Sequence, residues 1–141
     1  MDEFRDAIES RDQDRVIALM ADDVEFRSPV VYRPYHGRET VATILRAVVG
    51  VISDFSYTKQ IGAADGDDHA LVFRARVGDR EVEGCDFVHT NEDGLIDEFF
   101  VMVRPLSAAR AMSEAIGEAM RGEMALAESG DPSNGAMSQR A

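Results

Sequence analysis

Apolar residues recur at helical spacing near the amino terminus, with one polar interruption. Phe4, Ala7 and Ile8 are three and four positions apart, which puts them on one face of a helix. The period resumes after the polar residues 10–14, where Asp12 can cap a new helix. We therefore predict two short helices, over about residues 2–10 and 13–20.

Strand-like alternation and a third helical stretch follow this pair. A short alternating run is stopped by Ser28 and Pro29, and turn-forming residues precede Arg38. From Arg38 to Ile52 the apolar residues return to helical spacing, which predicts a long amphipathic helix. The period then changes to two, and short turns rich in Asp, Gly and Asn separate the runs. The predicted strands cover about residues 24–27, 55–61, 71–77, 81–90 and 95–103.

These elements define a fold class. Strands joined by such short turns must pair antiparallel. A single sheet can bury its own apolar face together with that of the long helix only by curving around the helix. We therefore predict an α+β protein, with the N-terminal helices packed on a curved, mainly antiparallel sheet in one domain over residues 1–106.

A further helix is predicted over residues 107–128, where Met112, Ile116, Met120 and Met124 recur every four residues. This stripe suits packing over the open end of the sheet or against a second subunit. A Met-rich face also suits a lipid or a partner groove. Gly, Pro, Ser, Asn and Gln dominate residues 129–141, a composition typical of a disordered tail.

Composition excludes several classes of function. Hydrophobic residues make up 45% of the 141 positions, and charged residues make up 30%. This balance is ordinary for a globular protein. The net charge of −12 argues against binding to nucleic acid or to an anionic membrane, because both need clustered Lys and Arg. The same charge says nothing against an uncharged small ligand.

Cysteine and histidine usage gives no sign of a metal or of another cofactor. Cys85 is the single cysteine, and the three histidines are scattered along the chain, so no zinc-ligand spacing occurs. The charged N-terminus does not read as a signal peptide, and no apolar run is long enough for a membrane span. We therefore expect a cytoplasmic protein without a cofactor.

Several short motifs resemble those of one known superfamily. They are Met20–Phe26, Ser28-Pro29, His36-Gly37-Arg38, Glu83–Phe87 and Asp93–Glu98. In this order and spacing they resemble the nuclear transport factor 2-like superfamily, and its bacterial SnoaL-like branch in particular. The resemblance covers roughly residues 2–105.

The resemblance implies a cone-shaped α+β barrel of the NTF2-like, or cystatin-like, type with an internal pocket, and often a homodimer. The superfamily includes ketosteroid isomerases, polyketide cyclases, epoxide hydrolases, dehydratases and binding domains without catalytic activity. The fold therefore does not imply a reaction.

The isomerases of this superfamily provide a residue-by-residue comparison. Their pattern needs a carboxylate before the Pro after the first strand, a Tyr in the first helix and an acid on the third strand of the meander. Here these positions hold Ser28, Phe4 and Asp86. A serine cannot carry a proton as a carboxylate does at neutral pH. The comparison therefore argues against steroid isomerisation by that mechanism.

Asp86 is the candidate catalytic acid. Burial in the pocket would raise its pKa and make it a proton donor or shuttle. The alternative is a structural carboxylate, satisfied by backbone N–H groups or by an Arg. Alternation puts Phe100, Met102 and Arg104 on one face of the last strand, from which Arg104 could pair with Asp86 or bind an anionic ligand group.

The loop before the long helix carries further candidates. His36 is either a base at the mouth of the pocket or a residue of loop packing. Tyr32 and Tyr35 are either donors to a ligand carbonyl or aromatic contacts of a dimer. His89 follows Asp86 by three residues, so alternation puts it on the opposite face, and His69 is expected to be exposed.

The preferred hypothesis is an apolar pocket for a small organic molecule, with Asp86 as its main polar group. One alternative is an acid–base enzyme of the isomerase, cyclase or dehydratase type that uses Asp86, assisted by His36 or Tyr32. Another alternative is a dimerisation module whose cone is filled and whose interface is the methionine stripe. The expected walls of the pocket are Phe4, Ile8, Leu45, Val49, Phe73, Phe100 and Met102.

Overall fold

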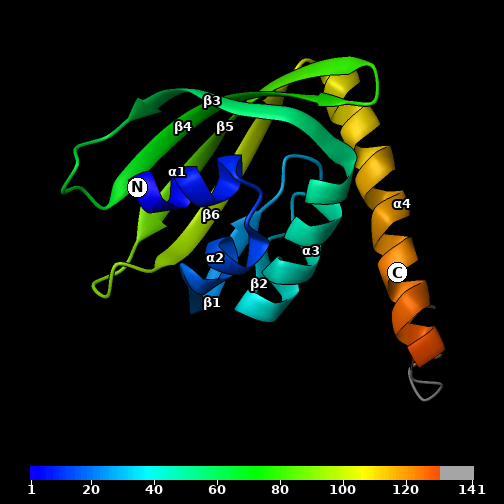
Figure 1. The fold of residues 1–141 in the computed structure, drawn as a ribbon, viewed down its shortest axis with the longest axis horizontal. Coiled ribbons are helices and arrows are strands. Elements are labelled where there is room, and N and C mark those ends of the chain that lie inside the picture. Colours follow the sequence, from blue (N-terminus) through cyan, green and yellow to red (C-terminus); the bar gives the residue numbers. More distant parts are fainter. Residues whose placement is uncertain (131–141) are drawn as a thin grey trace.

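The computed structural model describes residues 1–130, with side chains described up to Arg121. The predicted tail over 129–141 lies outside the described residues from position 131 onward. Four helices and six strands form the described part of the chain (Figure 1). They are α1 (Asp2–Glu9), α2 (Gln13–Ala18), β1 (Met20–Arg27), β2 (Tyr35–His36), α3 (Arg38–Val51), β3 (Ile52–Ile61), β4 (Asp68–Val77), β5 (Arg80–Thr90), β6 (Ile96–Arg104) and α4 (Leu106–Gly130).

The strands form one six-stranded sheet in the order β2-β1-β6-β5-β4-β3. Strands β3 to β6 form the predicted antiparallel meander, and β2 pairs antiparallel with β1. Strand β1 pairs parallel with β6, so the first strand of the chain lies beside the last one. The sheet curves around α1, α2 and α3, as Figure 1 shows. The prediction of an α+β fold on a curved, mainly antiparallel sheet is confirmed.

Strand β1 is longer than predicted. Its first residue, Met20, was expected to end the second helix, but that helix stops at Ala18. Met20 is fully buried and pairs with Ile96 of β6. This pairing is made between segments far apart in the sequence, so local spacing alone does not reveal it.

A β-bulge interrupts the pairing of β5 with β6. His89 is opposite Glu98 and Thr90 is opposite Ile96, which leaves Asp97 as an extra residue in β6. An extra residue shifts the alternation of all the side chains after it to the other face of the sheet. Phe99 is accordingly buried in the core, whereas Met102 is half exposed.

The core lies between the concave face of the sheet and the helices. Phe4 of α1 and Phe26 of β1 both meet the ring of Phe99 edge-on, at centroid distances of 5.6 and 5.4 Å. Aromatic pairs prefer this edge-to-face geometry. Helix α4 runs past α3 along the side of the domain, and its Ala108 and Met112 are buried. No helix in the described part of the chain is long and apolar enough to cross a membrane.

Helix α1 is attached to the free edge of β3 at a single residue, Tyr57. The Arg5 guanidinium donates to the Tyr57 carbonyl at 3.3 Å, and the Tyr57 N–H donates to the Glu9 carboxylate at 3.1 Å. Arg5 and Glu9 also pair with each other at 3.2 Å. The two backbone groups that an edge strand leaves unpaired are therefore satisfied at this position.

Candidate functional site

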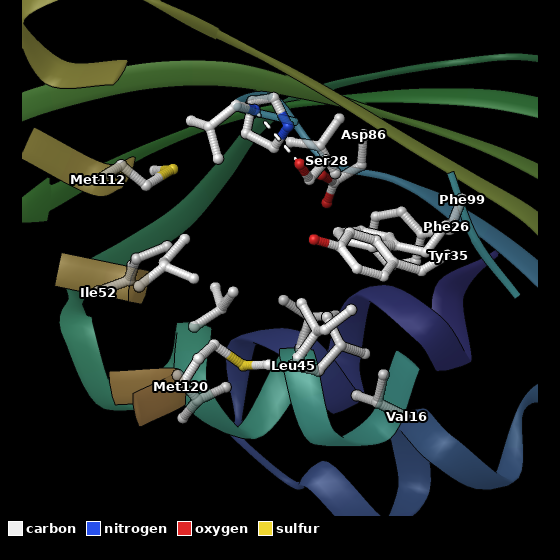
Figure 2. A pocket seen from close by; sticks show the side chains of 18 of the residues that line it. Val16, Phe26, Ser28, Tyr35, Leu45, Ile52, Asp86, Phe99, Met112 and Met120 are labelled. Carbon is white, nitrogen blue, oxygen red and sulfur yellow. Dashed lines mark hydrogen bonds between the residues drawn. The ribbon is translucent and has the colours of Figure 1, made fainter. Parts of the chain in front are cut away.

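A cavity of about 590 Å³ opens between the concave face of the sheet and the helices. Its lining is mostly apolar and comes from all four helices and from the inner face of the strands. In Figure 2, Phe26 and Phe99 form one side, Leu45 and Val16 lie below, and Met112 and Met120 approach from α4. The C-terminal helix thus supplies a wall of the cavity through Met112 and Met120, and Met124 of the predicted stripe lies outside the described side chains.

Three polar side chains meet at one end of this apolar space. Asp86, Ser28 and Tyr35 all line the cavity, and the Tyr35 hydroxyl points toward Asp86 (Figure 2). Arg11 also lines it, but its guanidinium donates to the carbonyl of Val49 at 2.7 Å, at the end of α3. The deep polar end is therefore built around one carboxyl group.

Asp86 reaches the cavity because of its position in β5. Alternation along this strand turns Val82, Gly84, Asp86 and Val88 toward the core. The Asp86 side chain is only 5% exposed, and its carboxyl accepts a hydrogen bond from the Tyr57 hydroxyl at 2.6 Å. Tyr57 lies on β3, two strands away from β5 in the sheet. The hydrogen-bond partner of Asp86 is therefore a neutral hydroxyl and not an arginine.

Burial and the tyrosine act on Asp86 in opposite directions. Desolvation disfavours the carboxylate and raises the pKa of Asp86 to about 7, while the hydrogen bond from Tyr57 lowers it. Burial and the nearby Asp86 charge raise the pKa of Tyr57, so that its hydroxyl stays protonated and donates. Near neutral pH the carboxyl group is therefore present in both its acid and its carboxylate form, as a proton donor or acceptor requires.

Tyr57 is the residue of this site that the sequence did not single out. It lies on β3 opposite Phe73 of β4 and is 5% exposed. Its backbone is held by Arg5 and Glu9 of α1, as described above. Alternation in its strand was visible in the sequence, but its partner Asp86 lies two strands away in the sheet and 29 residues on in the chain.

Phe73 lines the cavity as predicted, and a glycine allows its position. The Phe73 ring stacks on Phe55 with a centroid distance of 4.9 Å. A Cβ atom at Gly84 would lie 2.5 Å from the Phe73 ring and 2.6 Å from a backbone carbonyl of β6. Gly84 is thus needed for the ring to lie across β5 at the floor of the cavity.

Of the two other positions in the comparison with the isomerases, Ser28 lines the cavity and Phe4 does not. Ser28 does line the cavity, and its hydroxyl oxygen accepts the N–H of Val31 at 2.9 Å, which shapes the loop. Phe4 does not line the cavity; it is buried behind Phe99 in the core. The cavity therefore contains the serine that replaces a carboxylate, but not the phenylalanine that replaces a tyrosine.

Phe100, Met102 and Arg104 lie on the outer face of the sheet, contrary to prediction. The bulge at Asp97 reverses the alternation on which the prediction rested. Arg104 pairs with Glu83 at 2.8 Å and lowers the pKa of that carboxyl, so it is not the partner of Asp86. The β6 residues that face the cavity are Phe99 and Val101.

Of the three candidate residues in the loop before α3, only one lines the cavity. Tyr35 lines the cavity, whereas Tyr32 is fully exposed. His36 follows Tyr35 in β2, so its side chain points to the other face, where it is 3.9 Å from Glu25. Neither Tyr32 nor His36 is therefore placed to assist Asp86.

The remaining histidines lie away from the cavity. His89 is on the face opposite Asp86, as alternation predicts, and its Nδ1 is 2.5 Å from Asp97. The expectation that His69 is exposed is wrong: it is 6% exposed, because alternation in β4 puts it on the inner face with Leu71. Within the described residues, the cavity lining includes one carboxylate and no His or Cys, which is too few ligands for a divalent ion.

Comparisons with known proteins agree with this fold. The sequence profile of the SnoaL-like domain matches residues 1–99. Among curated proteins, none matches the chain. A steroid delta-isomerase from Pseudomonas aeruginosa is 40% identical, with a TM-score of 0.82, and the match covers 87% of this chain and 90% of that chain.

Two further solved structures share the fold. An uncharacterized protein with a cystatin-like fold from Silicibacter pomeroyi is 34% identical, with a TM-score of 0.78 and coverage of 82% of this chain and 81% of that chain. An NTF2-like protein from Burkholderia xenovorans is 19% identical, with a TM-score of 0.60 and coverage of 79% and 91%. The resemblance inferred from the short motifs is confirmed.

Proposed function

Because this chain belongs to the SnoaL-like domain family, we propose that it binds a small, largely apolar organic molecule in the cavity, with a carbonyl or hydroxyl group of the ligand at Asp86. The observation that carries this proposal is the combination of an apolar lining with one buried carboxyl at its deep end. Ligand pockets commonly have this composition, with a few polar groups that fix orientation.

The size of the cavity limits the ligand. A volume of about 590 Å³ lies within the range of pockets for drug-sized molecules, roughly 300–1,000 Å³. A fused-ring or similarly compact skeleton would fill it, and one polar atom at its end would reach Asp86 and Tyr35. A second strongly polar group in the middle of the skeleton would lie among Phe26, Phe73 and Leu45 and would be left without a partner.

Proton transfer by Asp86 is a second candidate function. The pKa of about 7 lets the carboxylate take a proton from a carbon next to a ligand carbonyl, and the resulting acid return it to another carbon. Such a step is an isomerisation without change of oxidation state. The 40% identity to a steroid delta-isomerase favours this candidate, whereas Ser28 in place of a second carboxylate disfavours the mechanism of the ketosteroid isomerases.

The test of binding uses steroid skeletons with and without a 3-keto group as probes. We expect the ketone to raise the melting temperature and to bind with saturation, and the matched hydrocarbon to bind more weakly. Met120→Glu places a charge in the cavity wall and should abolish binding. Met102→Glu makes the same change on the outer face, where Met102 is half exposed, and should leave binding intact.

The outcomes separate the two candidates. Equal binding by both Met variants would contradict the cavity as the binding site. Binding without turnover of an unsaturated ketosteroid supports the binding function alone. Turnover that is lost in Asp86→Asn, while binding is kept, supports proton transfer.

A further inference from the structure

A cluster of metal-ligating side chains lies on the outer face of the sheet, away from the cavity. His89 of β5 and Asp97 and Glu98 of β6 each offer one ligand atom, and these atoms all lie within 4.8 Å of one another. From this geometry we propose that the three residues form a binding site for a divalent transition-metal ion of the Zn²⁺ type.

The β-bulge is what brings the three side chains together. In a regular ladder, two consecutive residues of a strand point to opposite faces. At the bulge, Asp97 and Glu98 are both opposite His89, so two adjacent carboxylates reach the same side as the imidazole. The backbone positions of all three ligands are set by hydrogen-bonded strands and not by a loop, which makes the site rigid before any ion arrives.

The distances fit a small ion after a minor adjustment. Ligand atoms around a tetrahedral zinc ion, with bonds of about 2.0–2.2 Å, lie roughly 3.4 Å apart. The His89 Nδ1 and the Asp97 carboxylate are 2.5 Å apart, and the widest pair of ligand atoms lies within 4.8 Å. The required spacing falls between these values, so rotations of side chains alone can open one contact and close the others.

The charge around His89 also favours a cation. Asp68 of β4 is opposite His89 on its other side, which makes three carboxylates around one imidazole. In the part of the chain that the structure describes, no Lys or Arg pairs with Asp68, Asp97 or Glu98. A bound dication would neutralise most of this negative charge. The exposed fractions of the His89 and Asp97 side chains, 32% and 29%, leave room for water to complete the coordination.

The donor set indicates which ions would bind. One imidazole nitrogen with two carboxylate oxygens suits Zn²⁺ and its neighbours, whereas Mg²⁺ and Ca²⁺ prefer oxygen ligands only. A groove of about 270 Å³, lined by Asp68, His89 and Glu98, gives the ion a path from solvent. The consequence of binding would be a cross-link between β5 and β6 at the bulge, on the face of the sheet opposite Asp86.

The test is isothermal titration calorimetry, in which ZnCl₂ is added to the full chain. The protein has no histidine tag and is first stripped of metal with EDTA. We expect one Zn²⁺ per chain and an affinity that falls about tenfold or more in His89→Gln and in Glu98→Gln. His36→Gln is the matched control, because His36 is an exposed histidine 3.9 Å from Glu25, and it should leave the affinity unchanged. Circular dichroism of each variant without metal checks that the fold is kept.

Three outcomes would overturn the proposal. Absence of saturable binding would reduce the cluster to an ion pair of His89 with Asp97. Unchanged affinity in His89→Gln would place the ion elsewhere. Equal affinity for Ca²⁺ and Zn²⁺ would indicate only the general attraction of an acidic surface for cations.

Discussion

Replacement of Asp86 by asparagine isolates the cost of burying a carboxylate in the cavity. Asparagine has nearly the same shape and keeps an oxygen that can accept the hydrogen bond of the Tyr57 hydroxyl. The substitution therefore removes the charge and little else. In the wild-type protein, burial raises the pKa of Asp86 from 3.8 to about 7.

The sign and size of the effect follow from proton linkage. The native state holds the Asp86 proton up to about pH 7, whereas the unfolded chain releases it near pH 3.8. Below pH 3.8 the ionisation of Asp86 therefore does not change the free energy of unfolding. Between pH 3.8 and pH 7 the free energy of unfolding falls as the pH rises, and above pH 7 this decrease is complete. At about 1.4 kcal/mol per pH unit, the full loss is roughly 4 kcal/mol, of which about 2 to 3 kcal/mol falls between pH 5 and pH 8.

Urea unfolding at pH 5 and pH 8 measures this loss. The quantity of interest is the free energy of unfolding of Asp86→Asn minus that of the wild type, because the difference removes the effect of the overall charge of −12 on both proteins. We expect this difference to increase by about 2 to 3 kcal/mol from pH 5 to pH 8 in favour of the variant. Asp65→Asn, in an exposed turn, should show no such increase. A difference for Asp86→Asn that does not change with pH would refute the desolvation of this carboxyl.

Two other substitutions test neighbouring parts of the site. Tyr57→Phe should raise the pKa of Asp86 by about one to two units, because a hydrogen bond to a charged group contributes roughly 1.5–3 kcal/mol. Carboxyl ¹³C NMR would follow the titration of Asp86. An unchanged pKa would contradict the role of the Tyr57 hydroxyl. Gly84→Ala should destabilise the protein by about 1–3 kcal/mol in urea unfolding, because the new methyl group would overlap the Phe73 ring. Gly50→Ala, inside α3 with nothing within 4 Å, should be neutral or stabilising, and equal losses in the two variants would argue against this overlap.

The architecture was predictable because its signals are local and repeated. The helical spacing of Phe4, Ala7 and Ile8 and the alternation of the meander both lie within short windows of sequence. The parallel contact of β1 with β6 was not predictable in this way. It depends on a pairing between Met20 and Ile96, and no turn connects them.

The site was predictable where regular alternation holds. Asp86 and Phe73 lie in strands without a register shift between them, and both face the cavity as expected. Phe100 and Met102 follow the bulge at Asp97, so the same rule gave the wrong face. A bulge of one residue leaves no composition signal, and only the register of the pairing reveals it.

The hydrogen bond between Tyr57 and Asp86 could not be read from the sequence for a different reason. It joins side chains whose strands are separated by β4, so it depends on the curvature of the sheet as well as on register. The methionines of α4 are a case in which the sequence showed the residues but not their location. Their helical spacing was visible, but it was compatible both with packing over the sheet and with contact with a second chain. In the structure, Met112 and Met120 line the cavity.

The attachment of α1 to Tyr57 has a consequence for the solubility of the protein. The sheet has two free edges, β2 and β3, and exposed edge strands can recruit strands from other copies into aggregates. Strand β2 has only two residues, so it offers a poor template. Strand β3 has ten, but Arg5 and Glu9 occupy the backbone groups of its Tyr57 and place two charges along that edge. Helix α1 therefore acts as a guard against edge-to-edge association, and variants that lose either charged residue should aggregate sooner on heating.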